Sequence, residues 1–133
     1  MIDGNKSLEE LENCCWDDID FDSYVVRTAQ AARKKSLSQL TNEEIRLLIN
    51  QKIGLKYIIP IAVSIINKNP LIETTYFEGD LLIALLELSV SDWENNKSDL
   101  QLFQSIVRDN IDAVRSCENI KCDLLNDYLQ IVS

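Results

Sequence analysis

The chain has 133 residues, of which 46% are hydrophobic and 26% are charged, and its formal net charge at pH 7 is -9. This length predicts one domain, and the composition is that of a globular protein with its own core, which excludes a disordered chain or a coiled coil. So acidic a chain repels nucleic acid and anionic membranes, which favours a cationic protein as the partner. Because histidine is absent, Ser-His-Asp and Cys-His catalysis are excluded.

The first 22 residues carry most of the negative charge. They contain eight acidic residues and one basic residue, Lys6. We expect residues 1–20 to form an acidic, partly extended N-terminal segment of a single helical domain, residues 1–133. In an extended chain Asp18, Asp20 and Asp22 lie on one side at roughly 7 Å intervals, which suits a groove that binds consecutive phosphates. Charge concentrated in this way accelerates the encounter with a basic partner.

This segment is the predicted contact with a partner protein, because aromatic side chains alternate with its acids and can act as interface anchors. The candidate partner-binding residues are Glu12, Trp16, Asp17, Asp18, Asp20, Asp22 and Tyr24. The alternative is structural. Asp20 and Asp22 precede a predicted helix and could complement its dipole, and Trp16 and Phe21 could pack on the core.

No metal or cofactor site is expected. Asp18-x-Asp20-x-Asp22 begins like an EF-hand loop, but Ser23 and Ala29 stand where that loop needs Gly and a bidentate Glu. The four cysteines contain no Cys-x-x-Cys spacing, so reduced thiols are favoured over zinc.

Four Ser/Thr-x-x-Glu/Gln pairs mark expected helix starts, since each pair can satisfy free N–H groups of a first helical turn. They are Ser7 with Glu10, Thr41 with Glu44, Ser91 with Glu94, and Ser98 with Gln101. Apolar residues at helical spacing then predict the helix bodies. These stripes cover residues 24–32, 45–53, 55–66, 81–86, 100–114 and 124–132.

Three residues refine these boundaries. We expect Gly54 to end the helix before it, Pro60 to lie in the first turn of its helix, and Asp80 to cap the helix that follows. No segment alternates with period two. The predicted fold class is therefore all-α, a single compact domain of six or seven short helices with its core in residues 41–88.

An enzyme is not expected, because the acids cluster in one segment with no apolar pocket implied and no Gly-rich phosphate loop is present. The longest apolar run, residues 57–66, is about half of a bilayer span. With no secretory signal in the first thirty residues, the expected location is cytoplasmic.

A series of motifs in the middle of the chain resembles a known family. The motifs are Leu37-x-x-Leu40-Thr41-x-Glu43-Glu44-x-Arg46, Gln51-x-Ile53-Gly54-Leu55-x-Tyr57-x-x-Pro60, Asn69-Pro70-Leu71, Tyr76-x-x-Gly79-Asp80-Leu81-Leu82 and Trp93. In this order they resemble helical CdiI-type immunity proteins of bacterial contact-dependent growth inhibition (CDI) systems, over roughly residues 8–95. Asp17-Asp18 departs from the Gly or Pro expected after Trp16, which makes these aspartates candidates for partner-specific contacts.

The resemblance implies a cytoplasmic, non-enzymatic protein that binds the C-terminal toxin domain of a cognate CdiA effector in a one-to-one heterodimer and blocks it. Toxins of these systems are frequently nucleases, and the resemblance points to an EndoU-like RNase. A nuclease needs a basic face, which an acidic protein can cover in competition with RNA. The alternative is an acidic helical adaptor or nucleic-acid mimic that sequesters a basic regulatory protein.

Overall fold

The structure is a computed structural model that describes residues 4–12, 24–117 and 120. These residues form seven α-helices and two short 3-10 helices, and none of them lies in a β-strand. The helices are α1 (Leu8–Glu12), α2 (Tyr24–Lys34), η1 (Leu37–Gln39), α3 (Asn42–Asn50), α4 (Leu55–Lys68), α5 (Asp80–Leu86), η2 (Val90–Trp93), α6 (Lys97–Asp109) and α7 (Ile111–Ser116). The all-α prediction is confirmed. The expected stripe at residues 124–132 lies outside the described residues.

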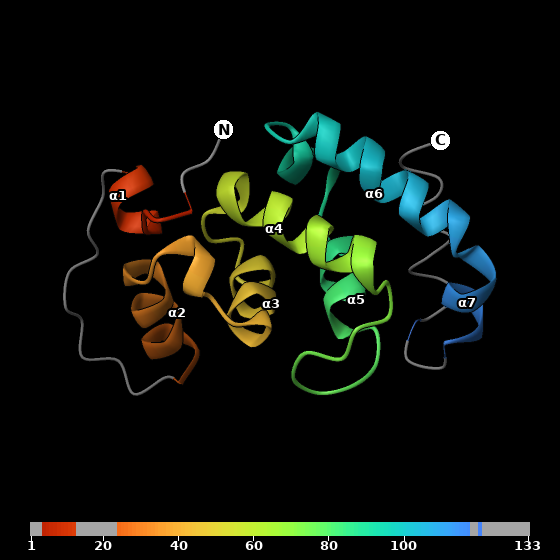
Figure 1. Ribbon diagram of the computed structural model, residues 1–133, viewed down its shortest axis with the longest axis horizontal. Coiled ribbons are helices and arrows are strands. Elements are labelled where there is room, and N and C mark those ends of the chain that lie inside the picture. The colour runs from red at the N-terminus through yellow and green to blue at the C-terminus, as the bar shows by residue number, and fades with distance from the viewer. Residues whose placement is uncertain (1–3, 13–23, 118–119, 121–133) are drawn as a thin grey trace.

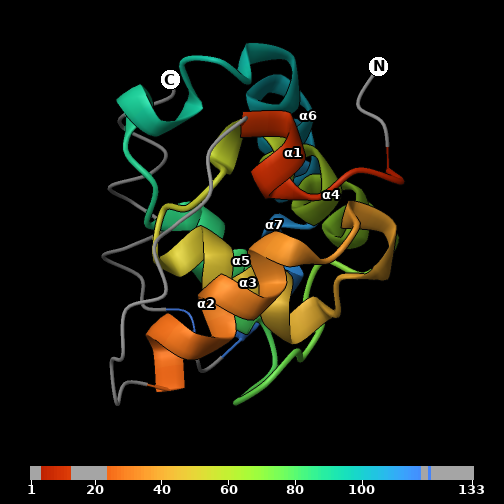
Figure 2. The same cartoon turned by 90° about the vertical axis from the view of Figure 1, so that its left-hand side faces the viewer.

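Helix α4 occupies the middle of the fold (Figure 1). It packs against α3 on one side and α6 on the other, and α3 also contacts α2 and α5. Figure 2, which turns the left-hand side of Figure 1 toward the viewer, shows α2 in front of α3 and, above it, α1 in front of α4. The two N-terminal helices are therefore packed onto the helices that form the core.

The core consists mainly of apolar side chains from α3, α4 and α5. Ile45, Leu48, Ile58, Ile59 and Leu82 are each at most 1% exposed, in agreement with a core between residues 41 and 88. Each such side chain contributes about 1.5–3 kcal/mol by leaving water. The helical spacing of apolar residues thus explains which face of each helix is buried.

Two of the four predicted capping pairs are confirmed. At the start of α1, the Glu10 N–H donates to the Ser7 hydroxyl at 3.3 Å. At the start of α3, the Glu44 N–H donates to Thr41 Oγ1 at 3.2 Å, and the Thr41 N–H donates to Glu44 Oε1 at 3.0 Å. Both termini are closed by side chains within three residues of the helix start, where sequence patterns are most informative.

The other two predicted pairs are wrong, because caps two residues earlier replace them. Ser89 and Asp92 form the capping box of η2, so Ser91 and Glu94 do not start a helix. Helix α6 has Asn96 as its N-cap, and the Asn96 carbonyl accepts from the Leu100 N–H at 2.9 Å. Ser98 and Gln101 consequently lie inside α6.

The prediction for Gly54 is also wrong. Helix α3 ends at Asn50, and Gly54 is the N-cap of α4, with a left-handed φ of 61°. A Cβ at this position would lie 2.7 Å from Cδ2 of Leu8, which is fully buried. Gly54 therefore permits both a reversal of the chain and close contact between α1 and α4.

Pro60 lies deeper in its helix than expected. It is the sixth residue of α4, so its missing N–H removes the usual donor to the Lys56 carbonyl. The side chain of Asn96, which is 6% exposed, supplies this donor from outside the helix. Its Nδ2 lies 3.1 Å from the Lys56 oxygen. The proline is tolerated because a residue 40 positions away completes the hydrogen bonding of α4.

This arrangement predicts that Asn96→Ala lowers the free energy of unfolding by about 1–3 kcal/mol, since the Lys56 carbonyl loses its partner in a partly buried hydrogen bond. In a Pro60→Ala background the restored N–H can bind the Lys56 carbonyl, and the same change should cost less. Urea unfolding of the wild type, the two single variants and the double variant measures this coupling. Asn95→Ala, at an exposed neighbour, serves as the control. An equal cost of Asn96→Ala in both backgrounds would contradict the compensation.

Candidate protein-binding surface

The structure describes two of the residues predicted to bind a partner. Glu12 ends α1, and its Oε1 lies 3.0 Å from Nη2 of Arg33, whose side chain is 2% exposed. Glu12 therefore neutralises a buried cation of α2. Tyr24 is the first residue of α2. Trp16, Asp17, Asp18, Asp20 and Asp22 lie outside the described residues, so their binding role stays a prediction.

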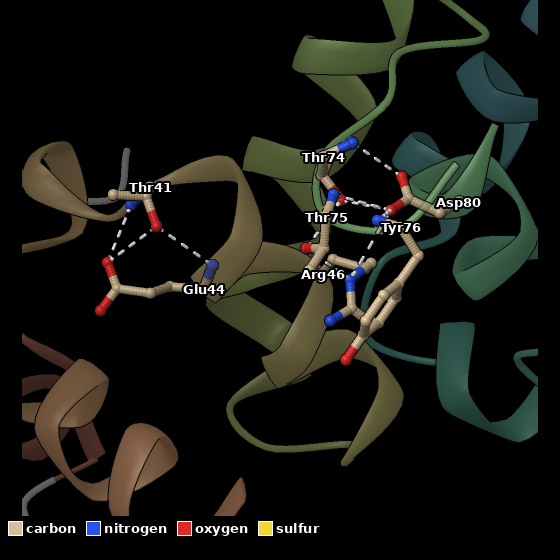
Figure 3. Close-up of polar contacts among 7 residues, drawn as sticks. All are labelled: Thr41, Glu44, Arg46, Thr74, Thr75, Tyr76 and Asp80. Carbon is tan, nitrogen blue, oxygen red and sulfur yellow. Dashed lines mark hydrogen bonds and ion pairs between the residues drawn. The ribbon is translucent and has the colours of Figure 1, made fainter. Parts of the chain in front are cut away.

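A second surface lies in the loop between α4 and α5, which one buried carboxylate holds in place. Asp80, 4% exposed, accepts from the backbone N–H groups of Thr74 and Thr75, both at 2.9 Å. It also accepts from the Tyr76 N–H at 3.1 Å and from the Thr74 hydroxyl at 2.9 Å (Figure 3). The expectation that Asp80 caps α5 is wrong. Gly79 is the N-cap, and the Asp80 side chain turns back to the loop that precedes the helix.

Arg46 of α3 completes this network. It is 8% exposed, and its Nε lies 3.1 Å from Thr75 Oγ1 and 3.9 Å from Asp80 Oδ2. Its guanidinium carbon lies 4.7 Å from the centre of the Tyr76 ring, a cation–π contact visible in Figure 3. Arg46 therefore balances the charge of Asp80 and supports the aromatic ring from the protein side.

The electrostatics identify Asp80 as a structural anion. Burial raises the pKa of the Asp80 carboxyl, but the backbone hydrogen bonds from Tyr76, Thr74 and Thr75, with that of the Thr74 hydroxyl, outweigh it. The pKa therefore lies below the ordinary value of 3.8. Asp80 remains ionised at neutral pH and is unsuited to act as a general acid there.

We call residues 73–79 the aromatic loop. Its outer face presents Tyr76, 68% exposed, and Phe77, 37% exposed. The exposed residues Glu73 and Glu78 flank these rings, and their backbones pair in an isolated antiparallel bridge. From the sequence, the region around Glu73 to Asp80 is the alternative binding face if the acidic segment is only a solvated tail, and Tyr76 enters only as part of a family motif. Two adjacent aromatic residues outside every helical stripe were the signal that could have identified this surface.

Other features of the described residues do not indicate catalysis. A groove of about 640 Å³ lies between η2 and α6 and is lined by Val90, Trp93 and Leu100 together with several polar side chains. Within residues 4–12, 24–117 and 120, no cluster of His, Cys, Asp or Glu could hold a metal ion. No helix in this part of the chain is long and apolar enough to span a membrane.

The fold and these surfaces define a small helical protein whose buried polar groups hold its own loops and helices. The sequence model of the CDI immunity proteins matches residues 10–102, more than half of the chain. This chain therefore belongs to the family of CDI immunity proteins, non-enzymatic inhibitors that neutralise a cognate CdiA toxin. The resemblance seen in the motifs is confirmed. Neither the curated proteins nor the solved structures provide a match.

Proposed function

We infer that the cognate CdiA toxin is a nuclease and that this protein inhibits it by covering the basic active-site face. The observation that carries this proposal is the charge of residues 1–22, which hold eight acids and one base. A nuclease attracts phosphates with a positive surface, so an acidic segment can both bind that surface and exclude the nucleic acid. The family resemblance favours an EndoU-like RNase as the toxin.

The fold supports this role for the N-terminal segment. Helices α1 and α2 lie on either side of residues 13–23 in the sequence and pack against each other. The chain is therefore attached to the folded protein both before and after residues 13–23. Glu12 is already paired with Arg33, which leaves electrostatic steering to Asp18, Asp20 and Asp22. Trp16 and Tyr24 would supply apolar contacts, with Asp17 as a further partner-specific acid.

In this proposal the protein acts in the cytoplasm as a one-to-one heterodimer with the C-terminal toxin domain. The family match favours this function over the alternative of an acidic adaptor that sequesters a regulatory protein. A rescue assay tests it directly: the toxin domain encoded immediately upstream is expressed with and without this protein, and RNA and DNA integrity are followed. Toxicity without nucleic-acid cleavage would contradict the nuclease assignment.

Reversing three acids is expected to slow complex formation. The variant Asp18→Lys/Asp20→Lys/Asp22→Lys should associate with the toxin domain about tenfold or more slowly at low salt, because electrostatic steering is lost. Stopped-flow association rates at several salt concentrations measure the effect.

The matched control changes the net charge by the same amount elsewhere. Glu87→Lys/Asp109→Lys/Asp112→Lys reverses three exposed acids of the described helices and loops. This control should retain most of the association rate. If both triple variants slow association equally, net charge alone is responsible, and the proposed role of the N-terminal segment is wrong.

A further inference from the structure

The aromatic loop has a rigid base and an apolar outer face. Three consecutive backbone N–H groups, from Thr74 to Tyr76, bind the Asp80 carboxylate, and Arg46 supports the Tyr76 ring. Core packing does not explain the outer face, since Tyr76 is 68% exposed. Large aromatic side chains held in water on an ordered loop are typical of a surface that binds another protein.

The charges around this face specify its partner. Residues 69–79 contain two acidic residues, Glu73 and Glu78, and no lysine or arginine. The nearby cation Arg46 is buried and lies against Asp80 and Thr75. The exposed residues of the aromatic loop are thus two aromatic residues and two acidic residues. Such a surface is complementary to an apolar depression bordered by basic side chains.

The position of the loop agrees with contact to the same toxin. In both Figure 1 and Figure 2 the aromatic loop and the first turn of α2 lie along the same lower edge of the molecule. Helix α6 and η2 lie along the opposite edge. One toxin domain can therefore reach the aromatic loop and the start of α2 together.

We propose that the aromatic loop is a binding hot spot for the cognate CdiA toxin, with Tyr76 and Phe77 as anchors and Glu73 and Glu78 facing basic toxin residues. The proposal rests on the immunity function of the family and adds the surface used. Because the loop is already held by Asp80 and Arg46, little conformational freedom is lost on binding. The aromatic loop should therefore act mainly by slowing dissociation of the complex.

The test uses the toxin domain encoded immediately upstream and the full-length protein. Tyr76→Ala/Phe77→Ala should weaken the affinity about 30-fold or more, chiefly through faster dissociation in surface plasmon resonance. The control Val90→Ala/Leu102→Ala removes apolar groups of similar exposure, 56% and 43%, from the opposite edge and should leave the affinity unchanged. Thermal unfolding verifies that both variants are folded.

If the double variant loses stability, Phe77→Ala alone retains the contact between Arg46 and Tyr76 and should still accelerate dissociation. Unchanged dissociation in both loop variants would overturn the proposal. This result is separate from the nuclease proposal, which depends on the toxin's activity and on the salt dependence of association. A toxin that cleaves no nucleic acid, yet dissociates faster from the loop variants, would refute the nuclease proposal and leave the proposal for the aromatic loop intact.

Discussion

Asp80→Ala is expected to lower the free energy of unfolding by about 3–5 kcal/mol, because it leaves several buried partners without their shared carboxylate. Three backbone N–H groups and the Thr74 hydroxyl would lose their acceptor. Arg46, which is 8% exposed, would stay charged without the neighbouring carboxylate. Urea unfolding at pH 7 measures the loss. Asp112→Ala is the matched control, since Asp112 also lies in a first helical turn but is exposed. It should cost about 0.3–1 kcal/mol.

The pH dependence provides a second check on Asp80. Its pKa in the folded protein lies below the ordinary value of 3.8, so the folded state binds this proton less readily than the unfolded state. The stabilisation is therefore complete above about pH 5 and is lost as the pH falls through the ordinary pKa and then the native pKa. The difference between wild type and Asp80→Ala should shrink in acid. A difference that stays constant from pH 7 to pH 3 would show that the ionised carboxylate is not the cause.

Gly54→Ala is expected to cost about 2–3 kcal/mol, from two sources. A left-handed φ of 61° disfavours any L side chain by about 1–2 kcal/mol. The new Cβ would also lie 2.7 Å from a methyl carbon of Leu8, so that a fully buried side chain must move. Thermal or urea unfolding measures the total.

Gly79→Ala separates the two sources. Gly79 has a φ of 85°, but a Cβ there would come no closer than 3.5 Å to a neighbouring atom. It should therefore carry the backbone cost alone. If Gly54→Ala destabilises the protein no more than Gly79→Ala does, the close contact between Gly54 and Leu8 does not contribute to the cost, and this explanation is wrong.

The helices could be predicted because their signals are local. The apolar stripes of α3 and α4 and the capping pair of Thr41 and Glu44 each lie within a few residues. The errors at Pro60 and Asp80 have different causes. The carbonyl that Pro60 leaves without its usual donor is bound by a distant side chain, whereas Asp80 binds N–H groups four to six residues before it instead of those of α5. Asn96 reaches Lys56 across 40 residues, and Arg46 reaches Thr75 across 29. Local patterns carry no information on such pairs.

The two proposed binding surfaces differ in how far the sequence indicates them. Composition alone located the acidic segment, because charge can be counted without a fold. The exposure of the aromatic loop could be seen only in the structure, since a pattern of residues cannot show whether Tyr76 and Phe77 face the core or the solvent. Their exposure depends on the turn that Asp80 imposes on the backbone.

Because Asp80 holds this loop by its backbone, the stability of the loop and its specificity for a partner depend on different groups. The carboxylate binds mainly backbone N–H groups, which every residue except proline provides, so the shape of the loop depends little on which side chains it displays. Residues 76–78 can therefore change while the loop keeps its path. An immunity protein built in this way can follow sequence changes in its toxin by exchanging the displayed side chains, with its helical scaffold left intact.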